Sequence, residues 1–462
     1  MSSGFATTSE WAISNFGDCD LGDVRRTRRA VQVASRMAEH PSGSSPQQMN
    51  EWAELKACYR LFHSQAVTFA ALARPHWEQT CAAARGRVLI INDTTTMSYR
   101  YRQDVEGFTR GGKGFPYGFQ LHNAMMVNAD NGEVLGLARQ ELFYRVPAPT
   151  KENRRQKGRR PRESDVWGRV IDAIGAPAAG VEYIHVCDRG ADNLEVFCHL
   201  RQQHCQWVIR CSHLNRDIQP VTAEGLGAVV SVEEALAKRP VLGTKSLSLR
   251  TRPGQPQRSV ELQVRVLEVS IPQPRRRTPY LRAIDYCEMR QTLVELREHR
   301  PRRGSEPLRW VIWTSLSVQT LEEAEAVIKI YEQRWLIEEL HKIMKTGCQL
   351  EERQYESAHC LEAVAGITSV LAVRLLSLKQ LSRSTPQTPA SDVVPKEWIK
   401  MVEALRKRHL PTVRDFVHNL ASLGGFLMRK DDGEPGWMTL WRGTERLLIA
   451  LQTQDALRRK CG

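Results

Sequence analysis

The sequence has no long uninterrupted hydrophobic segment of the kind that crosses a membrane. Its longest apolar stretch, AVAGITSVLAVRLLSL at residues 363–378, contains Arg374 and is shorter than the roughly 20 residues that a spanning helix needs. The first residues, MSSGFATTSE, lack both the basic and the apolar segments of a signal peptide. We therefore expect residues 363–378 to form a buried helix, and the protein to act in the cytoplasm without a membrane partner.

The sequence also lacks a framework of paired cysteines. Its eleven cysteines are an odd number without regular spacing, so free thiols are favoured over disulfides. Histidines and cysteines cluster between His185 and His213, but without the CxxC or HxxxH spacing of structural zinc sites, which leaves zinc as a minor alternative. The glycine-rich segment RGGKGFPYG (110–118) lacks the GxxxxGK[ST] pattern of a phosphate-binding loop and is expected to connect strands.

Acidic residues are fewer than basic ones. The chain has 52 Asp and Glu against 66 Lys and Arg, which gives a net charge of +14 and a pI near 9.4. Basic residues occur in runs at 25–29, 154–162, 274–277, 297–303 and 406–409. One such run is often only a solvated loop, but together they favour a polyanionic partner such as nucleic acid.

Hydrophobic spacing predicts three domains in the 462 residues. Residues 1–75 show helical periodicity and carry the basic run RRTRR. Residues 76–385 show the order strand, hairpin, helix, strand, helix, strand, typical of an α/β sheet of mixed direction. Within them, residues 220–305 alternate Val, Leu and Thr with Arg and Pro, which indicates a β-rich insertion. Residues 386–462 follow a linker and are again helical, and no internal repeat is visible.

The segment YEQRWLIEELHKIMK, residues 331–345, predicts one amphipathic helix with an unusual polar face. At about 100° per residue, Tyr331, Arg334, Glu338 and Lys345 project within an arc of about 60°. Ile330, Ile337, Leu340 and Met344 project from the opposite side and are expected to be buried. By itself this face could be merely solvated, with an Arg334–Glu338 pair four residues apart.

Two aspartates mark the ends of apolar strands. Asp93 follows GRVLIIN and Asp188 follows VEYIHVC, and ligands of α/β proteins bind beyond such strand ends. Each alone is commonplace, because Asp often caps a turn. If Glu338 joined them, three carboxylates beside basic groups would suit two Mg²⁺ ions, which prefer oxygen ligands and can activate water at a phosphodiester.

These features together resemble the DDE transposases of the insertion-sequence-four family. The spacing Tyr331-x2-Arg334-x3-Glu338-x6-Lys345 is similar to the YREK signature of that family. Similar segments occur in matching order, as LGDVRRTRR near the start, NDTTTMSYR around Asp93, VCDRGAD around Asp188 and LGGF…W…LW near the end. The resemblance covers essentially the whole chain. It implies an RNase H-like catalytic core with a β insertion, between helical N-terminal and C-terminal domains.

The resemblance also implies a role for each site residue. Asp93, Asp188 and Glu338 would hold two Mg²⁺ ions, for which Mn²⁺ could substitute. DNA contacts are implied for Tyr331, Arg334, Lys345, Arg189, Arg210, Trp310, Arg25, Arg26 and Arg28. Among these, Trp310 would stack on a base flipped out of the duplex, although core packing is the alternative. Asp192 matches an acidic residue of the family, whereas Gly190 stands where the family has Glu.

The implied activity is cut-and-paste DNA transposition. The expected steps are nicking, hairpin formation, hairpin opening and strand transfer into target DNA. A homodimer would bind the double-stranded transposon ends in a bacterial cytoplasm. One alternative is a domesticated DNA-binding or regulatory protein without transposition activity. Another is a stand-alone RNase H-like nuclease, which the two terminal domains disfavour because bare cleavage does not need them.

Overall fold

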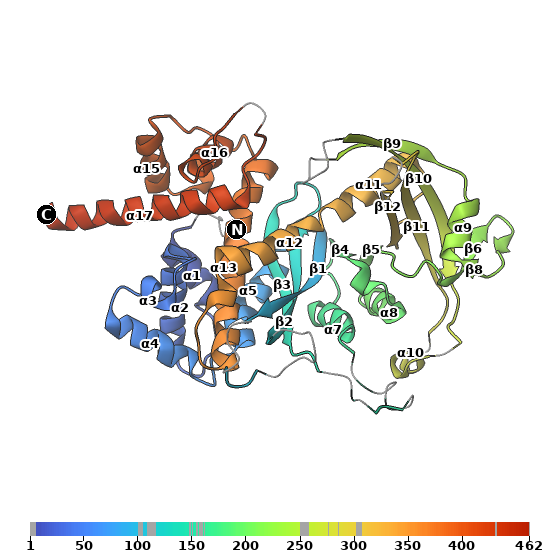
Figure 1. The fold of residues 1–462 in the computed structure, drawn as a ribbon, viewed down its shortest axis with the longest axis horizontal. Helices are drawn as coiled ribbons and strands as arrows, with labels where there is room; N and C mark the ends of the chain where they lie inside the picture. Colours follow the sequence, from blue (N-terminus) through green and yellow to red (C-terminus); the bar gives the residue numbers. More distant parts are fainter. Residues whose placement is uncertain are drawn as a thin grey trace. The chain divides into compact units, whose positions relative to one another are not determined.

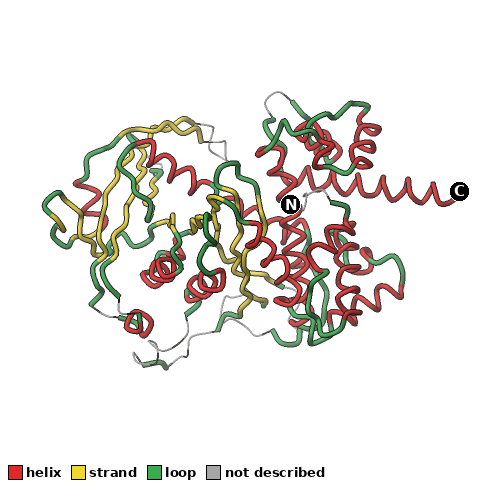
Figure 2. Tube along the Cα trace, turned by 180° about the vertical axis from the view of Figure 1, so that it is seen from behind, coloured by secondary structure: helices red, strands yellow, loops and turns green. Residues whose placement is uncertain are grey.

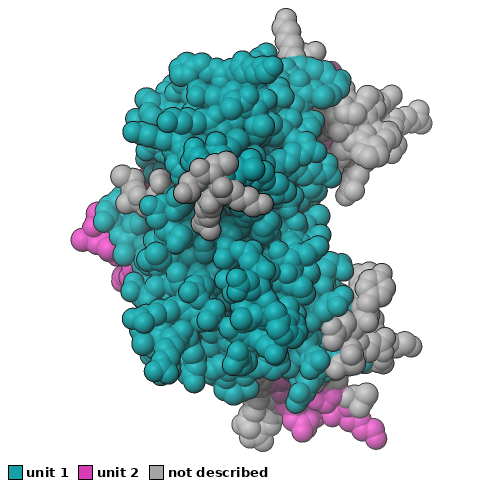
Figure 3. Space-filling view, turned by 90° about the vertical axis from the view of Figure 1, so that its left-hand side faces the viewer, with its two compact units in different colours: residues 1–85, 94–147, 336–462 teal, residues 86–93, 148–335 magenta. Residues whose placement is uncertain are grey.

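The structure is a computed structural model that describes residues 6–99, 105–108, 117–146, 149, 151–153, 156, 160, 162–249, 258–275, 277–284, 286–301, 307–429 and 432–461. The chain forms two compact units, shown in teal and magenta in Figure 3. Unit 1 comprises residues 1–85, 94–147 and 336–462, and unit 2 comprises residues 86–93 and 148–335. The fold is mixed α/β with helical segments at both ends of the chain (Figure 1), which confirms the fold class at this level.

Unit 1 begins with a series of helices whose starts are set by capping side chains. They are α1 (Thr8–Phe16), α2 (Val24–Glu39), α3 (Ser45–Gln48), α4 (Trp52–Phe62) and α5 (Phe69–Ala83). Thr7 and Glu10 form a capping box at α1, and the Asp23 carboxylate accepts from the backbone N–H of Arg25 at α2. Such caps satisfy the first N–H groups of a helix, which have no partner within it. Helix α5 runs through residue 75, and it packs on β3 and α13.

The C-terminal part of unit 1 is helical, as expected. It contains α13 (Ala358–Ser384), α14 (Ala390–Val393), α15 (Lys396–Arg406), α16 (Val413–Leu423) and α17 (Trp437–Cys461). Helix α13 extends well beyond the expected 363–378, and its length and composition alone would suit a membrane span. However, 89% of its most apolar window is buried inside the protein, which is typical of a core helix.

A buried arginine ties the N-terminal helices of unit 1 to the segment before α13. Arg353 donates to the carbonyl oxygens of Gly43, Pro41 and Cys348 at 2.7, 3.3 and 3.1 Å. It also donates to the Gln48 side chain at 3.0 Å. Burial lowers the pKa of Arg353, but these acceptors compensate for part of the lost hydration. The helices before residue 85 are therefore an integral part of unit 1.

Strand β1 (Gly86–Ser98) belongs to both units, because the boundary falls after Asp93. In unit 1 its last residues lie beside β2 (Gly118–Asn128), where Thr94 bonds to His122 at 2.8 Å and Thr96 to Gln120 at 2.9 Å. Strand β2 forms the expected hairpin with β3 (Val134–Phe143), through antiparallel pairing. The glycine-rich segment 110–118 lies mostly outside the described residues.

Unit 2 contains the other part of the sheet, drawn in yellow in Figure 2. Its strand order is β1-β4-β5-β12-β11-β10-β6-β7, with β8 beside β6 and β9 beside β10. The bounds are β4 (Val181–Cys187), β5 (Gln206–Arg210), β6 (Asp217–Thr222), β7 (Gly225–Leu226), β8 (Val230–Ser231), β9 (Gly243–Leu249), β10 (Arg258–Ile271), β11 (Met289–Glu298) and β12 (Arg309–Thr314). Strands β1, β4 and β5 are parallel and β12 is antiparallel to β5, so the direction is mixed as expected.

Helices cover both faces of this part of the sheet. They are α7 (Asp165–Ile174), α8 (Leu194–Gln202) and α11 (Leu321–Glu332). Trp310 and Trp313 are three residues apart on β12, so their side chains project to opposite faces. The Trp313 ring contacts Phe197 of α8, with 6.1 Å between centroids, whereas Trp310 contacts Tyr331 of α11 at 5.3 Å. Helix α8 therefore packs on one face of the sheet, and α11 packs on the other.

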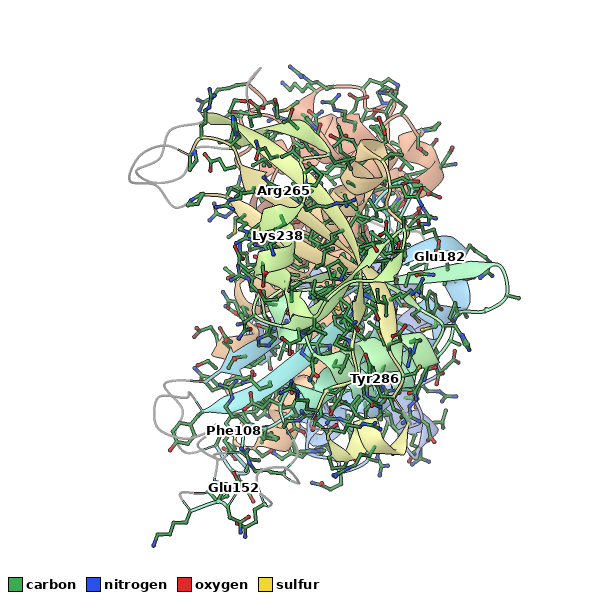
Figure 4. All side chains as sticks on the ribbon, turned by 90° about the vertical axis from the view of Figure 1, so that its right-hand side faces the viewer. Phe108, Glu152, Glu182, Lys238, Arg265 and Tyr286 are labelled. Carbon is green, nitrogen blue, oxygen red and sulfur yellow. The ribbon has the colours of Figure 1, made fainter. Side chains whose placement is uncertain are left out.

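The expected β insertion at 220–305 is β-rich, but its described residues also include helices. These are α9 (Val232–Lys238) and α10 (Pro279–Ala283). The α9 end lies against β10, where the Arg239 guanidinium donates to the Val266 carbonyl at 2.7 Å; Figure 4 labels Lys238 and Arg265 nearby. Buried Glu295 on β11 pairs with Arg265 and Arg309 at 3.2 and 2.8 Å. Some basic side chains of this region therefore form ion pairs within the protein.

The prediction of one helix over residues 331–345 is wrong. Helix α11 ends at Glu332, α12 spans Trp335–Lys342, and residues Ile343–Gly347 form a π-helical turn. At the break, Gln333 and Arg334 donate to carbonyl oxygens three residues back rather than four, at 3.1 and 3.0 Å. This tighter winding changes the rotation of later side chains, so the ideal 100° arc does not apply across it. The expected buried side of the segment is largely correct, because Ile337, Leu340 and Met344 are fully buried.

Candidate active site

Asp93 and Asp188 occupy equivalent positions beside one another on β1 and after β4 in unit 2. Strands β1 and β4 pair in parallel, and Asn92 lies opposite Cys187 in the register. Asp93 and Asp188 are the next residues along the chain from these two. The expectation that Asp93 ends a strand is wrong, because β1 continues to Ser98. Asp93 instead lies where the pairing of β1 with β4 ends, and Asp188 directly follows the last residue of β4. Two of the three expected metal ligands are thus brought together.

Asp188 begins a tight turn that the following residues hold in place. Its carboxylate accepts from the backbone N–H of Gly190 at 2.8 Å, within the 3₁₀ turn η1 (Arg189–Ala191). A Cβ atom at Gly190 would lie 3.0 Å from that carboxylate oxygen and 3.2 Å from Trp167. The glycine that departs from the family pattern therefore leaves space around Asp188. Arg189 is exposed on the same turn.

Asp192 is a structural residue of this turn. Its buried carboxylate accepts from the backbone N–H groups of Ser212 and His213 at 2.6 and 3.0 Å, and pairs with Arg216 at 2.7 Å. These contacts connect the turn after Asp188 to the segment after β5. Arg216 was not singled out from the sequence, because nothing local to it shows that it meets Asp192.

Basic and aromatic side chains gather on the α11 side of the sheet. The Arg210 guanidinium lies 5.5 Å from the Trp310 ring centroid, and the Trp310 ring meets Tyr331 edge to face at 5.3 Å. Trp310 is half-buried, unlike the fully buried Trp313. Burial raises the pKa of Tyr331, against the opposing effect of Arg334 and Arg210. Burial lowers the pKa of Arg210 to about 10, so this guanidinium is still charged at neutral pH.

Arg334 connects this cluster to the aspartates. One of its terminal nitrogens lies 3.7 Å from an Asp93 oxygen, and its guanidinium carbon lies 6.0 Å from the Tyr331 ring centroid. Both side chains of the Arg334–Asp93 pair are 18% exposed. Unit 2 therefore collects, next to the two carboxylates, the guanidinium groups and rings that phosphate and base recognition require.

Glu338 and Lys345 belong to unit 1. Glu338 lies on α12 and is partly buried. Lys345 lies in the π-helical turn, with its ammonium 3.8 Å from a Glu351 oxygen and its side chain 30% exposed. Glu351 in turn accepts from the backbone N–H of Ser98 at 2.8 Å. The third expected ligand is thus in a different unit from the two aspartates.

The three arginines of α2 for which a DNA contact is expected have different environments. Arg25 and Arg28 are exposed, whereas Arg26 is half-buried and donates to the Leu21 carbonyl at 2.9 Å. Arg26 therefore stabilises the turn that precedes α2. Arg25 and Arg28 are accessible to a partner.

The residues present fit a divalent cation in part. Among the described residues, no group of three or more His, Cys, Asp or Glu side chains is close enough to hold a metal ion. The Asp93 and Asp188 pair offers hard carboxylate oxygens, the donors that Mg²⁺ and Mn²⁺ take.

The His185–His213 cluster, by contrast, has buried free thiols at Cys187, Cys198, Cys205 and Cys211. Burial lowers the pKa of His185 to about 3 and raises the pKa of the Cys205 thiol to about 12.

Trp335 is a further residue of this region, and no sequence motif marks it. This residue follows Arg334, begins α12 and is 51% exposed. Its ring is therefore accessible at the start of the helix that carries Glu338. The signal in the sequence that could have indicated Trp335 is its position within residues 331–345.

Comparison with protein families assigns three segments of the chain. Residues 8–67 match the family described as Transposase DNA-binding. Residues 159–367, which include Asp188 and Glu338 but not Asp93, match the Transposase DDE domain. Residues 370–459 match the Transposase Tn5 dimerisation domain. In this order along one chain, the three matches support its assignment as a DDE transposase, with a DNA-binding segment before the DDE domain and a dimerisation segment after it.

Proposed function

We propose that the protein is a cut-and-paste DNA transposase of the YREK type that belongs to an insertion sequence. It would nick the transposon end, form and open a hairpin, and join the end to target DNA. In this proposal residues 1–75 recognise the transposon end, residues 76–385 form an RNase H-like catalytic core with an insertion at about 220–305, and residues 386–462 serve dimerisation and synapsis. The work would take place on DNA in a bacterial cytoplasm, by a homodimer.

The observation that carries this proposal is the pairing of Asp93 and Asp188 beside Arg334. Adjacent carboxylates, one within β1 and one directly after the parallel strand β4, favour a divalent metal, and the neighbouring guanidinium favours a phosphate. The strand order β3-β2-β1 in unit 1 and β1-β4-β5 in unit 2, with β1, β4 and β5 parallel, supports an RNase H-like core. Glu338 follows Arg334 by four residues, so the chain between them spans at most about 14 Å.

Each side chain then has a separate task. Asp93, Asp188 and Glu338 would hold two Mg²⁺ ions, which supply an activated water and stabilise the leaving oxygen of a phosphodiester. Tyr331, Arg334, Lys345, Arg189 and Arg210 would bind phosphates of the transposon end. Trp310 would stack on an extruded base. The half-buried position of Trp310, between Arg210 and Tyr331, supports this role over core packing.

The proposal is tested by incubating the full chain with DNA that flanks its own gene and with Mg²⁺. The expected result is a set of nicks and hairpins at fixed positions that depend on the end sequence. A protein that binds these ends without ever cutting them would instead be a domesticated derivative. Cuts without regard to sequence would indicate a nuclease.

We expect Arg25 and Arg28 to contribute to binding of the transposon end. The double substitution Arg25→Ala/Arg28→Ala should weaken end binding and lower the slope of log K against log salt by about two, because each lost phosphate contact lowers it by about one. Binding titrations from low to high salt measure this slope. The matched control is Arg60→Ala/Arg74→Ala, which removes two exposed arginines of α4 and α5. An equal loss in both variants would show that α2 has no special role.

Arg334→Ala and Lys345→Ala should each weaken binding of the cleaved end. Each should also lower the salt slope by about one, for the same reason. Lys400→Ala, which removes an exposed lysine of α15, is the control and should leave the slope unchanged. If neither substitution alters the slope, these two side chains are not phosphate contacts.

A further inference from the structure

Helix α12, which carries Glu338, is too short to fix its own orientation. It spans Trp335–Lys342, between the turn at Gln333 and the π-helical turn Ile343–Gly347. Isolated helices of this length are not stable in water, so tertiary contacts must set the position of α12 and its rotation about its axis. Those contacts can be followed within unit 1.

A chain of buried side chains leads to α12 from the strands of unit 1. The Trp77 indole N–H donates to the Gln140 side-chain oxygen at 3.2 Å, and Gln140 donates to the Asn123 side-chain oxygen at 2.6 Å. The Asn123 amide nitrogen lies 3.0 Å from Nε2 of His341, on α12. Ser369 of α13 also donates to the Gln140 oxygen, at 3.1 Å. Asn123 is fully buried, and Gln140 is 2% exposed.

The donor and acceptor roles along this series of hydrogen bonds are determined by Trp77. An indole N–H can only donate, so the Gln140 oxygen must face Trp77 and the Gln140 amide nitrogen must face Asn123. The Asn123 oxygen accepts from it, and the Asn123 amide nitrogen is therefore the donor to His341. His341 consequently accepts at Nε2 and carries its proton on Nδ1. Substitution of Asn123 by Ala would leave the Gln140 amide nitrogen and the His341 Nε2 atom without the hydrogen bonds that Asn123 makes to them.

A second contact holds α12 from another side. The Glu339 carboxylate pairs with the Lys379 ammonium of α13, and the Lys379 side chain is 3% exposed. A buried ion pair is geometrically demanding, because displacement of either group leaves a poorly solvated charge. Relative to Glu338, Glu339 projects at about +100° and His341 at about −60° around the helix axis. The two contacts therefore flank the direction of Glu338, and rotation of α12 either way would strain one of them.

We propose that Asn123, through His341, and Lys379, through Glu339, are positioning residues that fix the rotation of α12 and hence the direction of the Glu338 carboxylate. The inference rests on the proposed function, in which Glu338 is a metal ligand. None of the four residues needs to touch the metal or the DNA. Their effect would be to keep Glu338 in a metal-binding orientation before a cation arrives, as partners of ligand residues do in other metal sites.

The test compares binding of Mn²⁺ with cleavage. Mn²⁺ binding to the full-length protein is followed by the electron paramagnetic resonance signal of free Mn²⁺, and end cleavage is measured against Mg²⁺ concentration. Asn123→Ala and His341→Leu should each raise both half-saturating concentrations by about tenfold, the lower range found for partners of metal ligands. The double variant should be no worse than either single variant, because both remove the same contact. End-DNA binding should change by less than about twofold, since no phosphate contact is lost.

Two controls separate positioning from general loss of stability. His341→Gln keeps a side-chain acceptor for Asn123 and should restore metal binding towards the normal value. Asn419→Ala removes another buried asparagine, which bonds to the Asp415 carbonyl in α16, and should lower the melting temperature without altering metal binding. If Asn419→Ala shifts the metal dependence as much as Asn123→Ala does, the effect is one of stability and the inference is wrong.

Glu338→Ala distinguishes failure of the inference from failure of the proposed function. If Glu338→Ala weakens Mn²⁺ binding but Asn123→Ala and His341→Leu do not, Glu338 is a ligand and α12 is held by other means. If Glu338→Ala alters neither Mn²⁺ binding nor cleavage, Glu338 is not a ligand and the proposed function loses its third carboxylate.

Discussion

Asp188→Asn should abolish cleavage of transposon-end DNA and leave binding of that DNA nearly unchanged. The substitution keeps the size of the side chain and an oxygen that can accept from Gly190, but it removes the negative charge that holds a cation. Asp93→Asn and Glu338→Gln should have the same effect. We expect the cleavage rate to fall by at least about 10³-fold in each, as for loss of a central catalytic group. Gel assays of nicking, with parallel binding titrations, measure both quantities.

Stability should not account for this loss. The Arg334–Asp93 pair is partly exposed, so its removal should change the free energy of unfolding by less than about 1 kcal/mol. Asp217→Asn alters an exposed aspartate at the start of β6 and serves as the matched control. It should cleave normally. A variant of Asp93, Asp188 or Glu338 that nicks at the normal rate would remove that residue from the site.

Trp310→Ala should reduce hairpin formation much more than DNA binding. Stacking of an aromatic ring on a base contributes about 1–3 kcal/mol, which predicts a loss in hairpin yield of roughly 5–150-fold. The loss should fall on the hairpin step because an extruded base matters only when the strand must bend sharply. The fluorescence of 2-aminopurine at the second nucleotide from the cleavage site reports whether that base leaves the stack.

Two further substitutions separate stacking from packing at Trp310. Trp310→Phe keeps an aromatic face and should retain most of the hairpin yield. Trp310→Leu keeps an apolar side chain against Tyr331 without an aromatic face and should behave like Trp310→Ala. If Trp310→Phe and Trp310→Leu give the same hairpin yield, or if Trp310→Ala leaves the fluorescence signal unchanged, Trp310 packs in the core of unit 2 and does not stack on a base.

The strands that carry Asp93 and precede Asp188 could be predicted from the sequence because their signal is local. An apolar run that ends in Asp correctly indicates the end of β4 before Asp188. The same pattern misplaces the end of β1, which continues past Asp93 to Ser98. The parallel register that places Asp93 beside Asp188 follows once the two strands are neighbours. Trp310 and Arg210 are different, because their contact depends on β5 and β12 being adjacent, which no local pattern reveals.

The break between α11 and α12 could not be predicted from residue types. Neither Gly nor Pro is present between Tyr331 and Lys345, and Gln333 keeps a helical conformation with φ −66° and ψ −17°. The hydrophobic pattern therefore continues across a change of hydrogen bonding that it does not encode. The length of α13 was missed for a related reason, since Lys379 looks like a surface residue until its partner Glu339 is known.

The most direct test of the account is denaturing gel analysis of end DNA after incubation with the full chain and Mg²⁺, beside Asp188→Asn. The account predicts end-specific hairpins with the unaltered protein, and intact DNA, still bound, with Asp188→Asn. Hairpins of equal yield with both proteins would contradict it, as would cuts that ignore the end sequence.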